Sequence, residues 1–269
     1  MNDCKHIMAA VEIISVVRDC EMYNRCISNN PFCSDCEIQM LDNRKRNVGV
    51  PALYNGVLDS FDYSCPRWVA FCHEDFMPKE SLCNALDKAR EDRIYGTIGG
   101  VLLPKKTWLL GGLWCGEVRG AIVESEKDGT GAQCQGVDSP LDTIVETVDC
   151  QCIIVHSSLL QKYGLRFDEN LSFDLYAEDF CLGAYLKHGV KTAILPLKCQ
   201  HFSRGTVLPR FFEQKEYLDR KYPKAEAFGC VGYTVGGGRT SMRRFLKRIR
   251  AFLDRHARFV VDWYFKLIG

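Results

Sequence analysis

An unbroken apolar run, Trp68 to Cys72, is followed directly by the polar triplet His73, Glu74 and Asp75. A run of this length is typical of a strand that is buried on both faces of a parallel sheet. Open α/β sheets bind their ligands just beyond the carboxyl ends of such strands. The stretch therefore predicts either metal-binding or acid–base side chains at the edge of an α/β sheet, or an ordinary acidic turn in solvent.

The chain before this stretch alternates between strands and helices. Strands are predicted over residues 12–17 and 37–41, and helices over residues 21–28 and from Pro51 onward. A strand–helix–strand–helix–strand order is typical of a parallel sheet with right-handed crossovers. We therefore expect an α/β fold. Further strands are predicted at 94–103, 144–155 and 190–197, and helices at 79–90, 157–163 and after Tyr176.

Composition excludes several classes of protein. The 269 residues are 46% hydrophobic and carry a net charge of +1, so neither disorder nor general binding of polyanions is expected. No apolar run is long enough to span a membrane. The N-terminus lacks the basic and apolar regions of a secretory signal, and we expect a cytoplasmic protein.

The chain has 15 cysteines, many of them inside apolar runs. In a cytoplasmic protein a free thiol in such a run behaves as a small hydrophobic side chain. The group Cys26, Cys33 and Cys36 could instead bind zinc, although no matching second pair of cysteines follows it.

The second half adds two further candidate groups. Glu178 and Asp179 begin a predicted helix, where acids either cap the helix or act in chemistry. His201 follows the strand predicted at 190–197, and it is either an ordinary satisfied histidine or part of a site. The Gly-rich region 104–143 predicts a long loop or hairpin, and loops of that length are usually functional.

The order and spacing of these segments resemble a known enzyme family. The matching segments lie between residues 12 and 206, and they read ISVVRDCEMY, LDNRK, PALYNGVLDSF, WVAFCHEDF, VDCQCIIVHSSLL, GLRFDE, YAEDFCLGAYLKHG and CQHFSRG. Together they are similar to family 2 glycosyltransferases of the GT-A fold, and more narrowly to their StrF-like branch. HED stands in place of the usual Asp-x-Asp of the larger family. The resemblance implies a Rossmann-like, mostly parallel mixed sheet with helices on both faces.

The resemblance also implies a metal-dependent, inverting transfer of a sugar from a nucleotide-sugar donor to a hydroxyl acceptor. Asp75 would hold Mg²⁺ or Mn²⁺ on the donor diphosphate, and His201 would be a second ligand. Hard divalent cations take carboxylate and phosphate oxygens, and an imidazole ligand favours Mn²⁺ over Mg²⁺. The resemblance assigns nucleotide binding to eight residues: Val17, Arg18, Asp42, Asn43, Tyr54, Asn55, His73 and Glu74. For Glu74 the alternative is that it only shapes the turn.

By the same resemblance Asp179 would be the general base that takes the proton of the acceptor hydroxyl, with Glu178 as the alternative. Such a base must come within about 3 Å of the hydroxyl. Asp149 and Tyr176 would line the sugar or acceptor side. The donor base, sugar, acceptor and linkage are not readable from the sequence, and a polysaccharide or glycoconjugate product is the general expectation.

Residues 239–269 form a separate unit from the domain expected over 1–238. After the glycines at 236–238, apolar residues recur at helical spacing from Met242 to Leu267, and arginines and lysines occupy the other positions. A basic amphipathic helix of this kind fits the surface of an anionic membrane, and the acceptor would then be a lipid-linked saccharide. The alternative is a helix packed on its own domain or on a partner subunit.

Two other functions use the same residues. His73, Asp75 and His201 could bind a metal that activates water, which would make the protein a metal-dependent hydrolase. A catalytically inactive sugar-nucleotide-binding module is the third interpretation, and fold alone does not separate the three.

Overall fold

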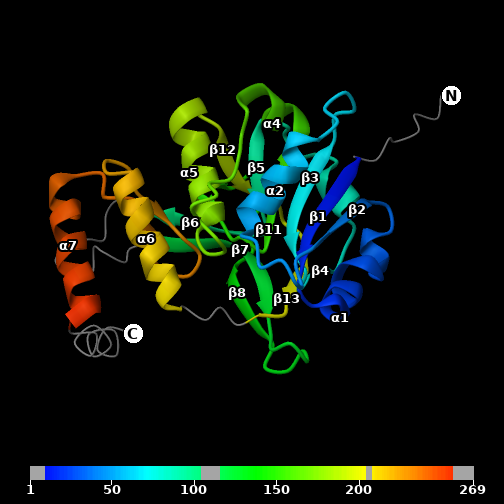
Figure 1. The fold of residues 1–269 in the computed structure, drawn as a ribbon, viewed down its shortest axis with the longest axis horizontal. Coiled ribbons are helices and arrows are strands. Elements are labelled where there is room, and N and C mark those ends of the chain that lie inside the picture. The colour runs from blue at the N-terminus through cyan, green and yellow to red at the C-terminus, as the bar shows by residue number, and fades with distance from the viewer. Residues whose placement is uncertain (1–9, 104–115, 204–207, 257–269) are drawn as a thin grey trace.

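The computed structural model describes residues 10–103, 116–203 and 208–256. Its main sheet has seven strands in the order β2-β1-β3-β11-β5-β12-β9 (Figure 1). β1 pairs parallel with β2 and β3, and β5 pairs parallel with β12, while β11 runs antiparallel between β3 and β5. The expectation of a mixed α/β fold is confirmed. The strands are β1 (Val11–Val17), β2 (Glu37–Asp42), β3 (Trp68–His73), β5 (Arg93–Gly96), β9 (Ile144–Val145), β11 (Cys152–His156) and β12 (Lys191–Ile194).

Helices cover both faces of this sheet because its central strands are apolar on both sides. Ile14 and Phe71 belong to one buried cluster, whereas Ile13 and Ala70 belong to the other. The first cluster contains residues of α2, α4, α5 and α6, and the second contains residues of α1, η1 and α3. These helices are α1 (Cys20–Tyr23), η1 (Asn24–Ser28), α2 (Val50–Asp59), α3 (Leu82–Leu86), α4 (Ser157–Tyr163), α5 (Tyr176–His188) and α6 (Pro209–Lys221); η2 (Pro31–Cys33) is a single 3-10 turn.

A second sheet has the order β10-β6-β7-β13-β4, with β8 paired to β7. The region expected as a loop or hairpin therefore contains the hairpin of β7 and β8. Two single strands predicted from the sequence are divided: residues 94–103 form β5 and β6, and residues 144–155 form parts of β9, β10 and β11. The strands of this sheet are β4 (Phe76–Pro78), β6 (Ile98–Leu102), β7 (Gly116–Glu124), β8 (Gln133–Val137), β10 (Thr147–Val148) and β13 (Cys199–His201).

At one end of the molecule α7 (Ser241–His256) lies beside α6 (Figure 1). The segment before it pairs β14 (Ala227–Phe228) with β15 (Thr234–Val235). In the described part of the chain no helix is both long and apolar enough to cross a bilayer. Residues 257–269, the rest of the expected amphipathic helix, lie outside the described residues.

The cysteines behave mainly as buried apolar residues. Most of the free cysteines in the described ranges are buried or half-buried, with Cys65 and Cys134 as the exposed exceptions. In the described part of the chain, the side chains that lie close enough together to share a metal ion are His73, Asp75 and His201. Cys26, Cys33 and Cys36 therefore do not assemble a zinc site.

Candidate functional site

Strand pairing brings together the three side chains of this group. His73 ends β3, Asp75 lies in the turn before β4, and His201 ends β13. β4 and β13 pair with Phe76 opposite His201, and the N–H of Phe202 donates to the carbonyl of Asp75 at 3.0 Å. The ligand atoms of the three side chains then all lie within 4.8 Å of one another. His201 thus belongs to a short strand of its own, not to the loop after β12 that the sequence predicted.

Several polar atoms of this cluster are buried without a hydrogen-bond partner. They are Oδ1 of Asp75 and both ring nitrogens of His201. Nε2 of His201 lies 3.3 Å from Oδ1 of Asp75, and Nδ1 of His73 lies 4.0 Å from the same oxygen. Buried polar groups are normally hydrogen-bonded, so orphaned atoms at one point need an explanation. Two imidazoles and a carboxylate are a donor set that suits a divalent transition metal.

The electrostatics of the cluster fit the same interpretation. Burial lowers the pKa of His73, which favours its neutral, metal-binding form. Burial raises the pKa of Asp75, but His201 and His73 outweigh this effect and hold that pKa at about 2. Burial lowers the pKa of His201, and Asp75 raises it by more, so the pKa lies above the ordinary value. These shifts favour the protonated form of His201 beside Asp75 and the neutral form of His73.

Tyr176 fixes the orientation of His73. Its hydroxyl donates to the carbonyl of Cys150 at 3.0 Å and lies 2.8 Å from Nε2 of His73. Because the single hydroxyl proton is used on Cys150, the Tyr176 oxygen accepts the Nε2–H of His73. This leaves the lone pair of Nδ1 directed toward Asp75. Hydrogen bonds to the ring nitrogen that does not bind the metal commonly orient metal-binding histidines. Tyr176, assigned to the sugar or acceptor side by the resemblance, is fully buried in this role.

A cavity of about 310 Å³ opens next to the cluster. Its lining includes His73 and Asp75 and two cationic side chains, Arg18 and Arg210. Ligand cavities start at about this size, and arginines are suited to phosphate oxygens. Phe173 stacks on His73 with ring centroids 5.4 Å apart, and the guanidinium of Arg210 lies over the Phe173 ring. The sequence analysis missed a set of lining residues that belong to no recognisable motif: Asn47, Val48, Ser172, Phe173 and Arg210.

Glu74 shapes the wall of this cavity. Its carboxylate accepts the backbone N–H groups of Arg18 and of Asp19, the latter at 2.9 Å. These bonds tie the β3–β4 turn to the loop after β1. The side chain of Arg18 in turn donates to Asn47. Glu74 therefore positions the Arg18 backbone, while its partly buried carboxylate borders the cavity.

The other residues assigned to the nucleotide differ in position. Asn43 lines the cavity and bonds twice to the backbone of Val48. Val17 is buried in the core, and only its carbonyl, which accepts the N–H of Asn43 at 2.8 Å, reaches this region. The carboxylate of Asp42 accepts three bonds from Arg44, one from its backbone N–H and two from its guanidinium, and borders a separate cavity of about 470 Å³.

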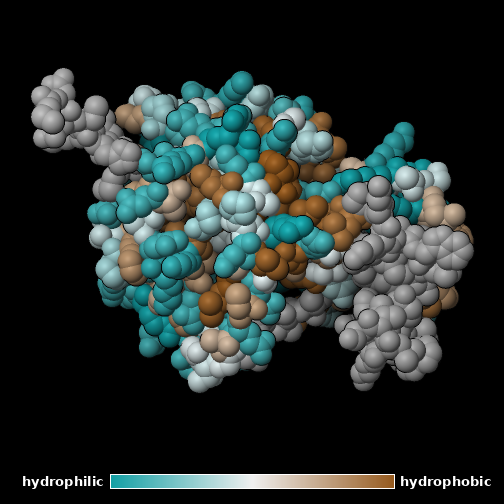
Figure 2. All heavy atoms as spheres, turned by 180° about the vertical axis from the view of Figure 1, so that it is seen from behind, coloured by the Kyte–Doolittle hydropathy of each residue, from teal (hydrophilic) through white to brown (hydrophobic). Residues whose placement is uncertain are grey.

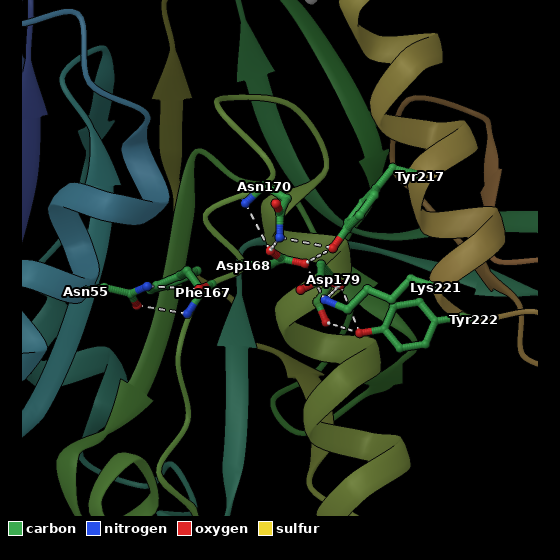
Figure 3. A network of polar contacts seen from close by, with 8 residues as sticks. All are labelled: Asn55, Phe167, Asp168, Asn170, Asp179, Tyr217, Lys221 and Tyr222. Atoms are coloured by element: carbon green, nitrogen blue, oxygen red, sulfur yellow. Dashed lines mark hydrogen bonds and ion pairs between the residues drawn. The ribbon is translucent and has the colours of Figure 1, made fainter.

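Tyr54 and Asn55 are core residues. Tyr54 is fully buried, with its hydroxyl 3.4 Å from the carbonyl of Cys72. The amide of Asn55 forms a two-way bridge with the backbone of Phe167, at 2.9 and 3.0 Å (Figure 3). Both side chains hold α2 against the body of the protein, and neither is among the residues that line the cavity.

Glu178 lies in the first turn of α5, close to Asp149. The side chain is buried, and burial followed by the nearby charge of Asp149 raises its pKa to about 8. The charge of the half-buried Asp149 also acts to raise the pKa values of His73 and His201, although burial keeps the pKa of His73 below its ordinary value. The backbone covers the carboxyl group closely, since a Cβ added at Gly229 would lie 2.9 Å from Oε1 of Glu178.

The backbone at the start of α5 is strained. Leu175 has a φ of 61° and a ψ of 9°, a left-handed conformation that costs a non-glycine residue about 1–2 kcal/mol. Burial of the Leu175 side chain, which is 4% exposed, holds it there. The turn sets the direction in which Tyr176 and Glu178 leave the helix start, and strain of this kind is often found at functional sites.

Asp179 points toward α6, where its carboxylate is bonded to two side chains (Figure 3). Its Oδ1 lies 2.6 Å from Nζ of Lys221 and accepts the hydroxyl of Tyr222 at 2.8 Å. Lys221 also pairs with Asp168 at 2.6 Å, and Asp168 accepts the hydroxyl of Tyr217 at 2.7 Å. Burial raises the pKa of Asp179, and Lys221 and Tyr222 reduce that effect. The network ties the start of α5 to the end of α6.

Comparisons with known proteins give a partial likeness of fold. No family model and no curated protein matches the chain. TarS 1–349 of S. aureus is 11% identical with a TM-score of 0.41, over 71% of this chain and 60% of that one. Its complex with UDP is 13% identical with a TM-score of 0.42, over 76% and 62%. A197 from STIV is 13% identical with a TM-score of 0.34, over 84% and 93%. The chain spans about three fifths of TarS 1–349, and these values identify no shared activity.

Proposed function

We propose that this chain is a metal-dependent, inverting glycosyltransferase that moves a sugar from a nucleoside-diphosphate donor to a hydroxyl acceptor. One observation carries the proposal: the orphaned ligand atoms of Asp75 and His201 lie beside a cavity lined with Arg18 and Arg210. A divalent cation would satisfy Oδ1 of Asp75 and one ring nitrogen of His201, and a diphosphate would satisfy the cation and the arginines together.

His73, Asp75 and His201 would hold the metal, Mn²⁺ or Mg²⁺, of which the two imidazoles favour Mn²⁺. When bound, the ion would neutralise the charge that develops on the departing diphosphate. Arg18 and Arg210 would bind phosphate oxygens, and Arg210 is already held in place by Asp174 at 2.6 Å. The ring of Phe173 would support the nucleotide on the side opposite the metal.

For the general base we favour Glu178 over Asp179. Asp179 pairs with Lys221 at 2.6 Å and faces α6 (Figure 3). Glu178 shares its surroundings with Asp149, and its pKa of about 8 is close to the pH at which an efficient base works. Glu178 would take the proton of the acceptor hydroxyl as that oxygen attacks the anomeric carbon, and Asp149 would lie on the acceptor side.

The acceptor would be a saccharide, either free or linked to a lipid, and polysaccharide or glycoconjugate synthesis is the corresponding role. A lipid-linked acceptor would place the enzyme at the cytoplasmic face of a membrane as a peripheral protein. The exposed apolar and basic residues of α7 support this location.

Calorimetry with UDP, GDP, CDP and TDP, with and without Mn²⁺, tests the donor site. We expect one diphosphate to bind only with metal, and Asp75→Ala to weaken that binding about 100-fold or more because it removes a direct ligand. Asp59→Ala is the matched control, since this carboxylate is 72% exposed and distant from the cluster. If folded wild-type protein binds none of the diphosphates in the presence of Mn²⁺, the proposal is wrong.

A metal-dependent hydrolase is the second candidate. Two histidines and one carboxylate within 4.8 Å leave coordination positions for water, as in sites that activate it. The two functions separate in the same measurements, because a hydrolase would bind the metal without a nucleoside diphosphate. Metal-dependent binding of a diphosphate without transfer to any acceptor would instead indicate an inactive sugar-nucleotide-binding module.

A further inference from the structure

α7 divides its residues sharply between two faces. At about 100° per residue, the apolar positions Met242, Phe245, Leu246, Ile249, Phe252 and Leu253 fall within an arc of roughly 120°. The remaining arc carries six lysines and arginines and a single acid: Arg243, Arg244, Lys247, Arg248, Arg250, Arg255 and Asp254. An apolar stripe of this width normally faces the core of a protein.

In α7 the apolar stripe does not face the core. Met242, Phe245 and Phe252 are 66%, 59% and 62% exposed, which places them, with Val137, among the four most exposed large apolar side chains of the described residues. A helix that packed its apolar face on its own domain would bury these three positions. The prediction of a helix is confirmed for Ser241–His256, and self-packing does not account for its apolar stripe.

The helix is nevertheless firmly attached to the body of the protein. Gly237 and Gly238 donate backbone hydrogen bonds to Tyr222 and Ala225 at 2.8 and 3.1 Å. A Cβ at Gly237 would lie 2.6 Å from the carbonyl oxygen of Pro223, so only glycine allows this close packing. The glycine run is therefore a packed connection.

Ion pairs set the rotation of α7 about its own axis. Arg239 pairs with Glu146 and donates to the carbonyl of Glu226, and Arg243 pairs with the buried carboxylate of Glu226, with one bond of 2.8 Å. Because Arg243 lies about 120° from the centre of the apolar stripe, these pairs hold the basic side of the helix against the body. The phenylalanines are thereby held toward solvent.

A second apolar area lies near this attachment. The view from behind in Figure 2 shows apolar side chains gathered between the main body and the end of the molecule that carries α6 and α7. Ile144 of β9 and Tyr185 and Leu186 of α5 are about half exposed and border a cavity of about 530 Å³, which Arg239 also lines. The attachment of α7 thus adjoins apolar surface on the body.

We infer that α7 is a fixed docking surface for an anionic phospholipid bilayer, with Phe245, Phe252 and Met242 inserted among the acyl chains. The helix carries six basic residues against one acid, and this excess matches the negative charge of anionic lipid headgroups. Aromatic and apolar residues beside basic ones are the composition of helices that lie in a membrane interface. The inference rests on the proposed function only for the reason why the chain would dock, which is to reach a lipid-linked acceptor.

Sedimentation of the full chain with lipid vesicles tests the inference without any measurement of transfer. One vesicle type is phosphatidylcholine alone, and the other contains phosphatidylserine as well. We expect binding to the anionic vesicles that weakens with added salt. Phe245→Glu and Phe252→Glu should each weaken it roughly tenfold or more, because a buried aromatic ring is lost.

Val137→Glu is the matched control, since Val137 on β8 is 60% exposed and should leave binding unchanged. Arg248→Glu, on the exposed basic face, should weaken binding to anionic vesicles only. The inference fails if the wild-type chain does not bind anionic vesicles, or if the phenylalanine variants bind as well as the control. It also fails if the wild-type chain self-associates and Phe245→Glu dissociates it, because the stripe would then cover a second copy. Vesicle binding together with failure to bind any diphosphate would reject the transferase and leave the docking surface intact.

Discussion

Two clusters that contain carboxylates lie near the start of α5, and they differ in whether their polar atoms have hydrogen-bond partners. In the Asp179 cluster, Lys221 lies 2.6 Å from two carboxylates and tyrosine hydroxyls bond to both (Figure 3). In the Asp75 cluster, a buried carboxylate oxygen and two imidazole nitrogens of His201 lack hydrogen-bond partners. A buried polar group without a partner costs about 1–3 kcal/mol. The first cluster is therefore bonded within the protein, whereas the second contains buried polar atoms without a hydrogen-bond partner in the described part of the chain.

Glu178 and Asp179 are neighbours in the sequence, but their side chains have different surroundings. Residues adjacent on a helix point about 100° apart. Asp179 accordingly faces α6 and its lysine, while Glu178 lies near Asp149. Tyr222, which bonds to Asp179, also accepts the backbone N–H of Gly237. The Asp179 cluster therefore connects α5 to the segment that carries α7, which is a structural role.

The largest expected effect is on transfer by the two isosteric variants of this pair. Glu178→Gln should lower the rate of sugar transfer about 10²–10⁴-fold, because it removes the general base, and should leave donor binding unchanged. Asp179→Asn should keep most of the transfer activity and lower the thermal stability instead. A transfer assay and calorimetric donor binding on both variants decide between them.

The pH dependence of transfer provides an independent check of the same assignment. Because the pKa of Glu178 is raised to about 8, first by burial and then by Asp149, the wild-type rate should rise with pH up to that range. Asp179→Asn should show the same rise. If Asp179→Asn abolishes transfer and Glu178→Gln does not, Asp179 is the base, as the resemblance to family 2 glycosyltransferases implies.

The next largest effect is on stability. Lys221→Met leaves Asp168 and Asp179 facing each other without a cation, and it should lower the free energy of unfolding by about 3 kcal/mol. Lys215→Met is the control on the same helix, because it removes only an i,i+4 pair with Asp219 and should cost roughly 0.5 kcal/mol. Urea denaturation of both variants measures the difference. Equal losses would show that the Asp179 cluster is not the structural one.

The smallest effect concerns the hydrogen bond that orients His73. Tyr176→Phe removes the oxygen that accepts Nε2–H of His73, so the lone pair of Nδ1 is no longer held toward Asp75. Affinity for Mn²⁺ should fall about tenfold, the usual effect of removing a hydrogen bond that orients a metal ligand. Tyr163→Phe, on a half-buried tyrosine that stacks on His188, is the control. An unchanged Mn²⁺ affinity in Tyr176→Phe would remove His73 from the set of metal ligands.

The sequence by itself determined the elements that depend on local pattern. Apolar runs such as Trp68–Cys72 placed the central strands, because a strand buried on both faces has no polar position. Helical spacing placed α2 and α5, and the polar residues after β3 marked one end of the sheet as the place of the site. The basic and apolar periodicity after residue 240 also predicted α7 correctly.

Only the tertiary structure decided which polar atoms are paired. The pairing of β4 with β13 brings His201 to Asp75, and no local pattern encodes a contact across 126 positions (201 − 75). Lys221, Arg210 and Phe173 take their roles from long-range packing and belong to no motif. The sequence could not separate Glu178 from Asp179, because their difference lies in what faces each side of one helix. The local pattern therefore indicates which residues could do chemistry, whereas the packing of distant segments decides whether their polar atoms are free to do it.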